Sequence, residues 1–423
     1  MCSLPRGKIG ATLSKASKVG ARRHSAQLAE FGSEFGGCVN PSKIRGGNTA
    51  AFDSMIGMLG STPVLSLSSL VQKLSSLRDC PAHKRPDVLV KLESTNPGWS
   101  VKARPAVHML EQAERRGDIK PGTVIIESSS GNTAIAMAMV SAMKGYHFKP
   151  VVDIKMPQGK LDLLRVFGAD VELVGDPNIP PDEQDMVQLK KDRRATVARL
   201  VAELGDRAYS PNQYANPDNA GSHVLSTGPE LLEQLNGDID ALILPISTGG
   251  QVRSPPTPSG RPSPRLSRRP SGRTAAALRT RTERAGCESP CAPLPLRGSQ
   301  INGIGRFIKE HLPECQLIGT EPIGSTILQE GSGDYYNAGS GLDYAPVPVE
   351  HMLADRLIDH AWAIPDAASF KTSRLLAKTT GALMGPTTGM QVFAALALAI
   401  ENPGMGNIAV VGCDDGRAYV PDM

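Results

Sequence analysis

Short apolar runs in this chain repeatedly lead into a polar turn that opens a helix. The run at residues 123–127 is rich in β-branched side chains, residues 128–133 read Ser-Ser-Ser-Gly-Asn-Thr, and helix-forming residues 134–144 precede a second apolar run at 149–154. Strand, turn, helix and strand in this order indicate a βαβ unit of a parallel sheet. Ligands of such sheets bind where the strands end. The chain is therefore predicted to be an α/β protein with a ligand site at the carboxyl edge of its strands.

The turn at residues 128–133 has the composition of an anion-binding loop. Its hydroxyl groups and the backbone N–H groups at the start of the following helix can surround a negative charge. A helix start with excess capping groups is the alternative interpretation, but a single serine is enough to cap a helix. Three consecutive serines therefore favour binding.

A second turn of this kind is interrupted. The apolar run at 241–246 leads into Ser-Thr-Gly-Gly-Gln at residues 247–251, where paired glycines allow a phosphate to approach the backbone. Residues 252–300 then hold nine prolines and ten arginines without a hydrophobic period, which predicts a disordered insertion. The helical pattern resumes at Ile301, so the insertion divides one functional loop into two halves.

The two ends of the insertion resemble the ends of an intron. Every codon for Val252 begins with GT, and Gln300 can be encoded by CAG. We hypothesise that the segment is a retained intron or a gene-model error. Transcripts sequenced across Gln251 and Ile301 test this, and the hypothesis fails if every transcript carries the 49 codons in frame.

Lys102 lies where a strand is predicted to give way to a helix. An apolar run at 88–92 and the turn-forming Asn-Pro-Gly at 96–98 precede it, and a helical pattern follows over residues 105–117. By itself, a lysine in the first turn of a helix is a solvated side chain. A position after the end of a buried strand instead places it in the ligand site, together with the turns described above.

The net charge of +4 conceals two basic segments on an acidic body. Residues 1–50 carry eight Lys and Arg against two Glu, and residues 252–300 carry ten Arg against two Glu, which leaves about −10 for the rest. An acidic body gives no ground for a nucleic-acid partner, and the insertion lacks the interleaved aromatic residues of such a surface. Residues 1–53 are predicted to be a disordered extension or a mitochondrial transit peptide.

Apolar runs and cysteines bear on the compartment. No apolar run approaches the roughly 18 residues that a membrane span needs, so no membrane segment is expected. The seven cysteines are odd in number and no secretory signal is present, which indicates an intracellular compartment, cytoplasmic or mitochondrial. Cys287 and Cys291 have no matching pair elsewhere, so no metal site is expected.

Over about residues 56–423, the insertion excepted, the chain resembles the cysteine synthase and cystathionine β-synthase family. This family consists of pyridoxal 5'-phosphate (PLP) enzymes of fold type II, the tryptophan synthase β-like fold. The resemblance implies a homodimer. It also implies that each subunit has two doubly wound α/β domains with PLP in the cleft between them. The larger domain would consist of residues 54–89 and 217–423, and the smaller of residues 90–216. Six motifs carry it in the family's order: Asn96-Pro97-Gly98-Trp99-Ser100-Val101-Lys102, Ser129-Ser130-Gly131-Asn132-Thr133, Asn212-Gln213-Tyr214, Thr227-Gly228-Pro229-Glu230, Ser247-Thr248-Gly249-Gly250 and Gly385-Pro386-Thr387-Thr388-Gly389.

The resemblance also implies a role for each motif. Lys102 would hold PLP as a Schiff base and, once an amino acid displaces it, take the proton from Cα. Thr387 would place a neutral hydroxyl at the pyridine nitrogen, which leaves the ring a weaker electron sink, suited to β-elimination. The other site residues are Asn132, Ser247, Thr248, Gly249, Gly250 and Gln251 for the cofactor, and Ser129, Ser130, Gly131, Thr133 and Gln213 for the substrate and its carboxylate.

The implied reaction is β-replacement on small amino-acid substrates. An activated L-serine, O-phosphoserine or O-acetylserine, would lose its leaving group to give an aminoacrylate that a nucleophile attacks. Residues 104–106 and 212–216 most resemble the siderophore-type enzyme that joins phosphoserine to glutamate, so the product would be a diaminopropionate precursor or cysteine. A serine/threonine dehydratase or racemase on the same fold is an alternative, and so is an inactive pseudoenzyme if the insertion is translated.

Three positions depart from the family pattern. Trp99 stands where cysteine synthases usually have Gly, and Ala103 stands where they have Asp. The entrance beside Lys102 is therefore predicted to be narrower or differently charged. Gln251, or Gln300 if the loop is divided one residue earlier, replaces a Thr that helps to hold the phosphate.

Overall fold

The computed structural model describes residues 54–74, 77, 80–81, 85–246, 300–325, 335–337, 340 and 357–422. Contacts divide the chain into two compact units, Met1–Asp53 and Ser54–Met423, and every described residue lies in the second unit. The predicted N-terminal extension and the insertion up to residue 299 lie outside the described residues. The helix expected to resume after the insertion is present and begins at Gln300.

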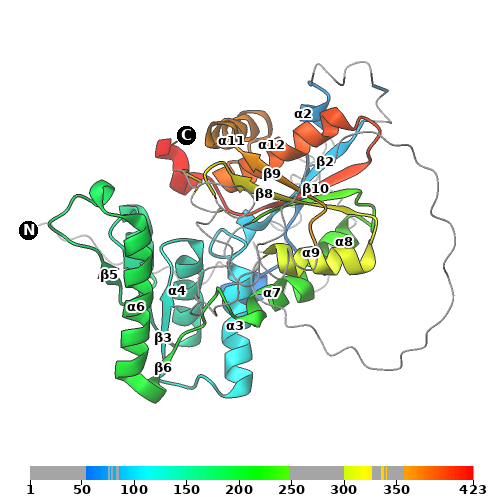
Figure 1. The fold of residues 1–423 in the computed structure, drawn as a ribbon. Coiled ribbons are helices and arrows are strands. Elements are labelled where there is room, and N and C mark those ends of the chain that lie inside the picture. The colour runs from blue at the N-terminus through cyan, green and yellow to red at the C-terminus, as the bar shows by residue number, and fades with distance from the viewer. Residues whose placement is uncertain are drawn as a thin grey trace, which may run out of the picture. The chain divides into compact units, whose positions relative to one another are not determined.

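Six strands form the larger sheet. Their order is β1-β2-β10-β7-β8-β9, and every neighbouring pair is parallel except β1 and β2. The parallel α/β architecture expected from the sequence is therefore confirmed (Figure 1). The strands are β1 (Val64–Ser66), β2 (Asp87–Leu92), β7 (Ala241–Pro245), β8 (Gln316–Pro322), β9 (His360–Ile364) and β10 (Asn407–Gly412).

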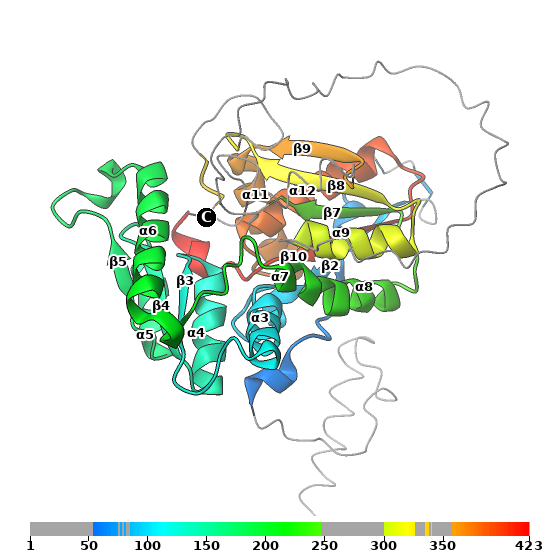
Figure 2. The same cartoon turned by 60° about the horizontal axis from the view of Figure 1, so that its bottom comes forward.

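Helices cover both faces of the larger sheet. On one face α12 packs against β2, β7, β8 and β10, and α11 packs on α12. On the other face α9 contacts β7 and β8, and α8 lies beside α9 (Figure 2). The bounds are α2 (Ser68–Val71), α7 (Pro217–Ser222), α8 (Gly228–Gln234), α9 (Gln300–His311), α11 (Asp366–Thr380), α12 (Pro386–Glu401), the π-helix η8 (His223–Thr227) and the 3-10 helices η2 (Met55–Met58) and η9 (Arg417–Asp422).

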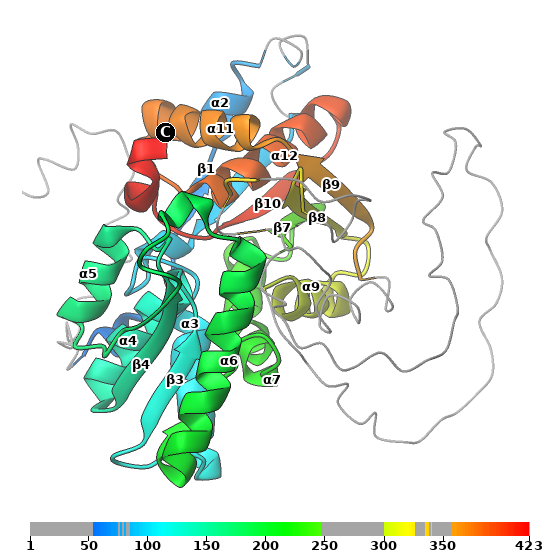
Figure 3. The same ribbon diagram turned by 60° about the vertical axis from the view of Figure 1, so that its left-hand side comes forward.

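Four parallel strands form the smaller sheet, in the order β5-β4-β3-β6. The chain moves from β3 through β4 to β5 in one direction and then returns across the sheet to β6. Because crossovers between parallel strands are right-handed, α4 and α5 lie on one face and α6 on the other (Figure 3). The reversal makes the carboxyl ends of β3 and β6 a topological switch point, where α/β proteins bind ligands.

The smaller sheet, its helices and the segments that connect it to the larger sheet complete the described fold. α3 packs against both α4 and α7. The elements are η5 (Glu93–Thr95), α3 (Ala103–Arg116), β3 (Val124–Ser128), α4 (Asn132–Lys144), β4 (His147–Asp153), α5 (Gln158–Val166), β5 (Glu172–Val174), η6 (Pro181–Glu183), α6 (Met186–Leu204), η7 (Gly205–Arg207) and β6 (Ala208–Tyr209).

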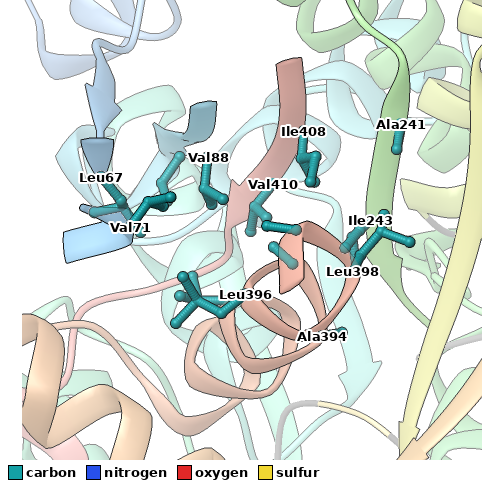
Figure 4. Close-up of a cluster of buried hydrophobic side chains, with 14 of the residues drawn as sticks. Leu67, Val71, Val88, Ala241, Ile243, Ala394, Leu396, Leu398, Ile408 and Val410 are labelled. Atoms are coloured by element: carbon teal, nitrogen blue, oxygen red, sulfur yellow. The ribbon is translucent and has the colours of Figure 1, made fainter. Parts of the chain in front are cut away.

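The core of the larger sheet lies between its central strands and α12. Leu396 and Leu398 of α12 belong to one buried cluster with Val88 of β2, Ile243 of β7 and Val410 of β10. Figure 4 shows Leu398 next to Ile243. α12 is apolar around most of its circumference because it is covered by the sheet on one side and by α11 on the other. This packing fixes the position of the first turn of α12, which begins near the candidate site.

One predicted boundary does not coincide with the strands. β2 pairs with β10 over its whole length, from Asp87 opposite Asn407 to Leu92 opposite Gly412. The domain boundary predicted between residues 89 and 90 therefore falls inside a strand of the larger sheet. The bounds are implied by the family resemblance, which does not specify where a strand of this chain begins or ends. The division into two domains stays a prediction.

No helix in the described part of the chain is long and apolar enough to cross a membrane.

Candidate active site

Lys102 is held at the end of the larger sheet. It is the residue before α3, and the segment leading to it adds to the end of β10: Val101 N donates to the carbonyl oxygen of Cys413 at 2.8 Å, and Ser100 forms an isolated antiparallel bridge with Asp414. Burial lowers the pKa of the Lys102 amine, and the nearby Cys413 and Asp414 act in the opposite direction. A lowered pKa increases the neutral fraction of the amine, which is the form that attacks a carbonyl group.

The turn before Lys102 has unusual backbone angles. Gly98 has a φ of 76° and Trp99 a φ of 57°, so a bulky side chain occupies the left-handed region that favours glycine. Trp99 is 39% exposed, and the guanidinium carbon of Arg417 lies 5.0 Å from the centre of its ring. Ala103 is fully buried among the side chains of α3 and α4. Of the two departures beside Lys102, Trp99 is therefore the one that reaches solvent.

The residues expected to bind the substrate carboxylate meet at the switch point of the smaller sheet. Ser129 Oγ accepts a hydrogen bond from Gly131 N at 3.3 Å, in the loop between β3 and α4. Thr133 Oγ1 donates to Gln213 Oε1 at 2.6 Å, and Gln213 Nε2 donates to the carbonyl oxygen of Ser128 at 3.5 Å. The loops after β3 and β6 are thus joined through side chains that the sequence motifs had indicated separately.

Asn132 is half-buried and forms a polar cluster with two buried residues that follow β10, Asp414 and Tyr419. Its Nδ2 donates to Asp414 Oδ2 at 2.7 Å, and the Tyr419 hydroxyl donates to the same oxygen at 2.7 Å. Burial raises the pKa of both Asp414 and Tyr419. Asp414 Oδ1 is buried without a hydrogen-bond partner among the described residues. Through Asp414, the structure connects Asn132 with the segment that holds Lys102.

Thr387 lies in the first turn of α12. Its Oγ1 donates to Asn337 Oδ1 at 2.7 Å, and both side chains are buried. The neighbouring Thr388 Oγ1 accepts from Cys413 N at 3.1 Å, which ties α12 to the residue opposite Val101. Lys102, Asn132 and Thr387 therefore lie around one end of β10. Ser247, Thr248, Gly249, Gly250 and Gln251, the predicted phosphate residues, lie outside the described residues.

Sequence motifs missed two buried groups beside the substrate loop. Arg193 of α6 donates through Nη1 to Ser130 Oγ and, at 3.0 Å, to Asp153 Oδ2 at the end of β4. Ser130 Oγ donates to the same Asp153 oxygen at 2.9 Å. Nothing in the sequence singled out Arg193, because it is one of several basic residues on an amphipathic helix and resembles a solvated face.

Glu127 is a third buried group, at the end of β3. Burial raises its pKa to about 7, although hydrogen bonds from Gln213, Asn212 and Ser128 act to lower it. Glu127 Oε2 has no hydrogen-bond partner in the described part of the chain. The hydrogen bonds from Gln213 and Asn212 connect Glu127 with the loop that carries Gln213.

The sequence of this chain is similar to the sequences of a known protein family. The sequence profile of the family described as "Pyridoxal-phosphate dependent enzyme" matches residues 57–253 and 296–414. This chain belongs to the pyridoxal-phosphate dependent enzymes. The two matched ranges leave out residues 254–295, which lie within the proline- and arginine-rich insertion.

Curated relatives of this PLP enzyme include cysteine synthases. The cysteine synthase of Staphylococcus aureus (strain Mu50 / ATCC 700699) is 30% identical over 370 residues, which cover 87% of this chain and 95% of the relative. Cysteine synthase B of Salmonella typhimurium is 29% identical over 362 residues, which cover 86% of this chain and 92% of the relative. Both alignments extend over nearly the whole of each relative.

Solved structures agree with this membership. A hydrogen sulfide-producing enzyme from Fusobacterium nucleatum is 26% identical with a TM-score of 0.66, covering 88% of this chain and 98% of that one. O-ureido-L-serine synthase is 24% identical with a TM-score of 0.65, covering 88% of this chain and 94% of that one, and supports the fold alone. The enzyme therefore has the fold type II, tryptophan synthase β-like architecture, and its cofactor is PLP.

The described side chains fit this cofactor. A Schiff base with PLP needs a lysine whose amine loses its proton readily, and burial lowers the pKa of Lys102. Asn132 Nδ2 carries two hydrogens, and Asp414 accepts only one of them. Lys102 and Asn132 are thus suited to hold the cofactor, whereas Thr387 donates its single hydroxyl proton to Asn337 Oδ1 and would have to exchange that bond to donate to the pyridine nitrogen. The buried Asp414 Oδ1 shows that polar atoms at this place still have hydrogen-bonding capacity.

Proposed function

We propose that this PLP enzyme catalyses β-replacement on an activated L-serine, O-phosphoserine or O-acetylserine. The observation that supports it most is the combination of Lys102, whose amine has a lowered pKa, with a hydroxyl-rich helix start joined to Gln213. The cysteine synthases of Staphylococcus aureus and Salmonella typhimurium, aligned over 86–87% of this chain, support the same class of reaction.

The reaction requires a base at the Cα atom of the bound amino acid. PLP supplies the electron-accepting ring that makes this Cα proton acidic. Lys102 is the residue that would take the proton, because a neutral amine accepts a proton and burial favours the neutral form. Cys413 and Asp414 act to raise the pKa of the lysine and partly offset the effect of burial.

The substrate carboxylate would bind at the start of α4. Backbone N–H groups at a helix N-terminus carry a partial positive charge, and α4 is a helix of 13 residues. Ser129, Ser130, Gly131, Thr133 and Gln213 line this loop or bond to it. Holding the carboxylate here would orient the substrate for proton transfer to Lys102.

The product is proposed to be cysteine or a diaminopropionate precursor. The two products differ in the nucleophile, which is sulfide in the first case and glutamate in the second. Trp99, three residues before Lys102, lies against Arg417, whose guanidinium pairs with Asp415 at 2.8 Å, so the charge of Arg417 is balanced and favours neither nucleophile.

A substrate screen tests the proposal. O-acetylserine and O-phosphoserine are each incubated with sulfide or with glutamate, and amino-acid products are measured by mass spectrometry. Two versions of the protein are compared, the full chain and a variant without residues 252–300. Product that forms only when a nucleophile is added supports β-replacement. Pyruvate or D-serine formed without a nucleophile would instead show a dehydratase or a racemase, and absence of turnover in the full chain alone would show that the insertion inactivates it.

We also propose that the enzyme is a homodimer, as the family resemblance implies. Light scattering coupled to size-exclusion chromatography measures this directly on the full chain. A mass of one chain, about 45 kDa, would contradict the proposal.

A further inference from the structure

Arg193 joins the substrate loop to the opposite face of the smaller sheet. It lies on α6, which covers one face, whereas the loop at residues 128–133 opens α4 on the other. The side chain is 7% exposed, and Asp153 at the end of β4 is 2% exposed. Arg193 therefore reaches across the carboxyl edge of the sheet and ends at Ser130 and Asp153.

The single hydroxyl proton of Ser130 is already used in a hydrogen bond. Ser130 Oγ donates to Asp153 Oδ2 at 2.9 Å and accepts from Arg193 Nη1. The second oxygen of Asp153 accepts from Lys155 N at 3.1 Å, so the carboxylate is held on both sides. Ser130 has no proton to offer to a substrate carboxylate while these contacts stand.

The other two hydroxyls of the loop differ from each other. Thr133 donates its proton to Gln213 Oε1 at 2.6 Å, so it is occupied in the same way as Ser130. Ser129 Oγ accepts from Gly131 N, and its own hydroxyl donates to none of the described residues. Among the described hydroxyls expected to bind the carboxylate, Ser129 therefore keeps its proton for a ligand.

We propose that Arg193 and Asp153 are a positioning pair that sets the affinity of this site for the amino-acid substrate. They hold Ser130 and leave Ser129 as the hydroxyl that meets the carboxylate. Arg193 also neutralises Asp153, which would otherwise place a buried negative charge behind a loop that binds an anion. The inference rests on the proposed function, because it names the residues that tune the same site.

The test measures amino-acid binding to the PLP-loaded full-length protein. The change in cofactor absorbance on adding L-serine or O-acetylserine gives a Kd, and steady-state assays give KM and kcat separately. Arg193→Gln is expected to raise Kd and KM by about tenfold or more, while kcat changes by less than about threefold. A residue needed only for folding would lower the amount of active protein and leave Kd unchanged.

Three variants serve as controls. Arg199→Gln lies on the same helix, but its side chain is 50% exposed and pairs with Glu203 and Glu172, so it should bind as the wild type does. Arg193→Lys retains a charge that can donate to both partners and should keep Kd within about threefold of the wild type. The double variant Asp153→Asn with Arg193→Gln removes both charges and should bind more tightly than Arg193→Gln alone.

Ser129 and Ser130 provide a matched pair. Ser129→Ala should raise Kd by about tenfold, and Ser130→Ala by less than about threefold, because only Ser129 has a proton to donate. The reverse order would overturn the proposal. This pair leaves Arg193 and Asp153 in place, so it decides the question even if Arg193→Gln fails to fold.

The remaining outcomes separate this inference from the proposed function. An Arg193→Gln protein with the wild-type Kd would overturn the positioning role. An Arg193→Lys protein as weak as Arg193→Gln would also overturn it, because the guanidinium would then contact the ligand itself. A wild-type protein whose PLP absorbance responds to no amino acid would contradict the proposed function instead.

Discussion

Two buried arginines lie close to the candidate site, and they differ in how fully their donors are used. Arg104 follows Lys102 by two residues and is 2% exposed, and Arg193 stands behind the substrate loop and is 7% exposed. Arg104 donates through Nε, Nη1 and Nη2 to Glu93 and Glu230. Arg193 donates through Nη1 alone, and its Nε is buried without a hydrogen-bond partner in the described part of the chain.

Each of the three guanidinium nitrogens of Arg104 has a hydrogen-bond partner. Burial acts to raise the pKa of Glu230, but hydrogen bonds from Arg104 and Lys91 outweigh it and lower this pKa to about 2. Glu93, the other carboxylate bound by Arg104, also accepts a hydrogen bond from Thr62 Oγ1 at 2.7 Å. The network joins the start of α3 to β2, η5 and α8, and it fixes the element that follows Lys102.

The difference indicates different roles. A buried charge whose donor nitrogens all have partners is costly to remove and holds one arrangement. A buried arginine with a spare donor is held less tightly and is suited to a loop that changes its contacts when a substrate binds. Arg104 therefore stabilises the frame around Lys102, and Arg193 tunes a binding loop.

Arg104→Met should cause the largest loss of stability. It leaves Glu93 buried without its cation, and removing one partner of a buried ion pair costs about 3–5 kcal/mol of unfolding free energy. Urea unfolding followed by circular dichroism measures the loss. Arg199→Met on α6 is the control, because its exposed pairs contribute about 0–1 kcal/mol. A loss for Arg104→Met no larger than that of the control would refute the role assigned to the network.

Glu127→Gln should change how stability depends on pH. The folded carboxyl has a pKa of about 7 against an ordinary 4.5, so between these values the folded state holds a proton that the unfolded state has released. Stability is therefore greatest below pH 4.5 for this group and falls as pH rises to 7, by on the order of 3 kcal/mol.

Glutamine cannot ionise, so Glu127→Gln should lack this loss in the same pH window. The unfolding temperatures of the two proteins are measured at several pH values within this window. The described residues show no ion pair for the buried Glu127, whereas the buried Glu93 pairs with Arg104. This result therefore tests how a buried carboxyl behaves without a cation. Parallel pH profiles for the two proteins would show that Glu127 stays ionised when folded.

Arg193→Gln should cost less stability than Arg104→Met, about 3 kcal/mol, because Arg193 pairs with one buried carboxylate and Arg104 pairs with two carboxylates. Its main effect should be on amino-acid binding, as argued above. Urea unfolding of both variants under the same conditions makes the comparison. Equal losses of stability would break the distinction between a structural and a tuning arginine.

Much of the fold could be predicted from local patterns. The run at 123–127 and the helical residues 134–144 correspond to β3 and α4, although α4 begins two residues earlier, at Asn132. α12 likewise begins inside its motif, at Pro386. In both cases the polar motif is itself the first turn of the helix, where capping residues are preferred, so composition places the boundary too late.

The sequence by itself determined the order of strands, turns and helices and, through its motifs, the lysine and the loop expected to bind PLP and substrate. These are local properties, because periodicity and turn chemistry act over a few residues. Only the tertiary structure decided which side chains share their protons. Asn132 meets Asp414 across 282 residues, and Arg193 meets Ser130 across 63. Such contacts depend on the crossing of α6 over the sheet and on the register of β10, which no short stretch of sequence specifies.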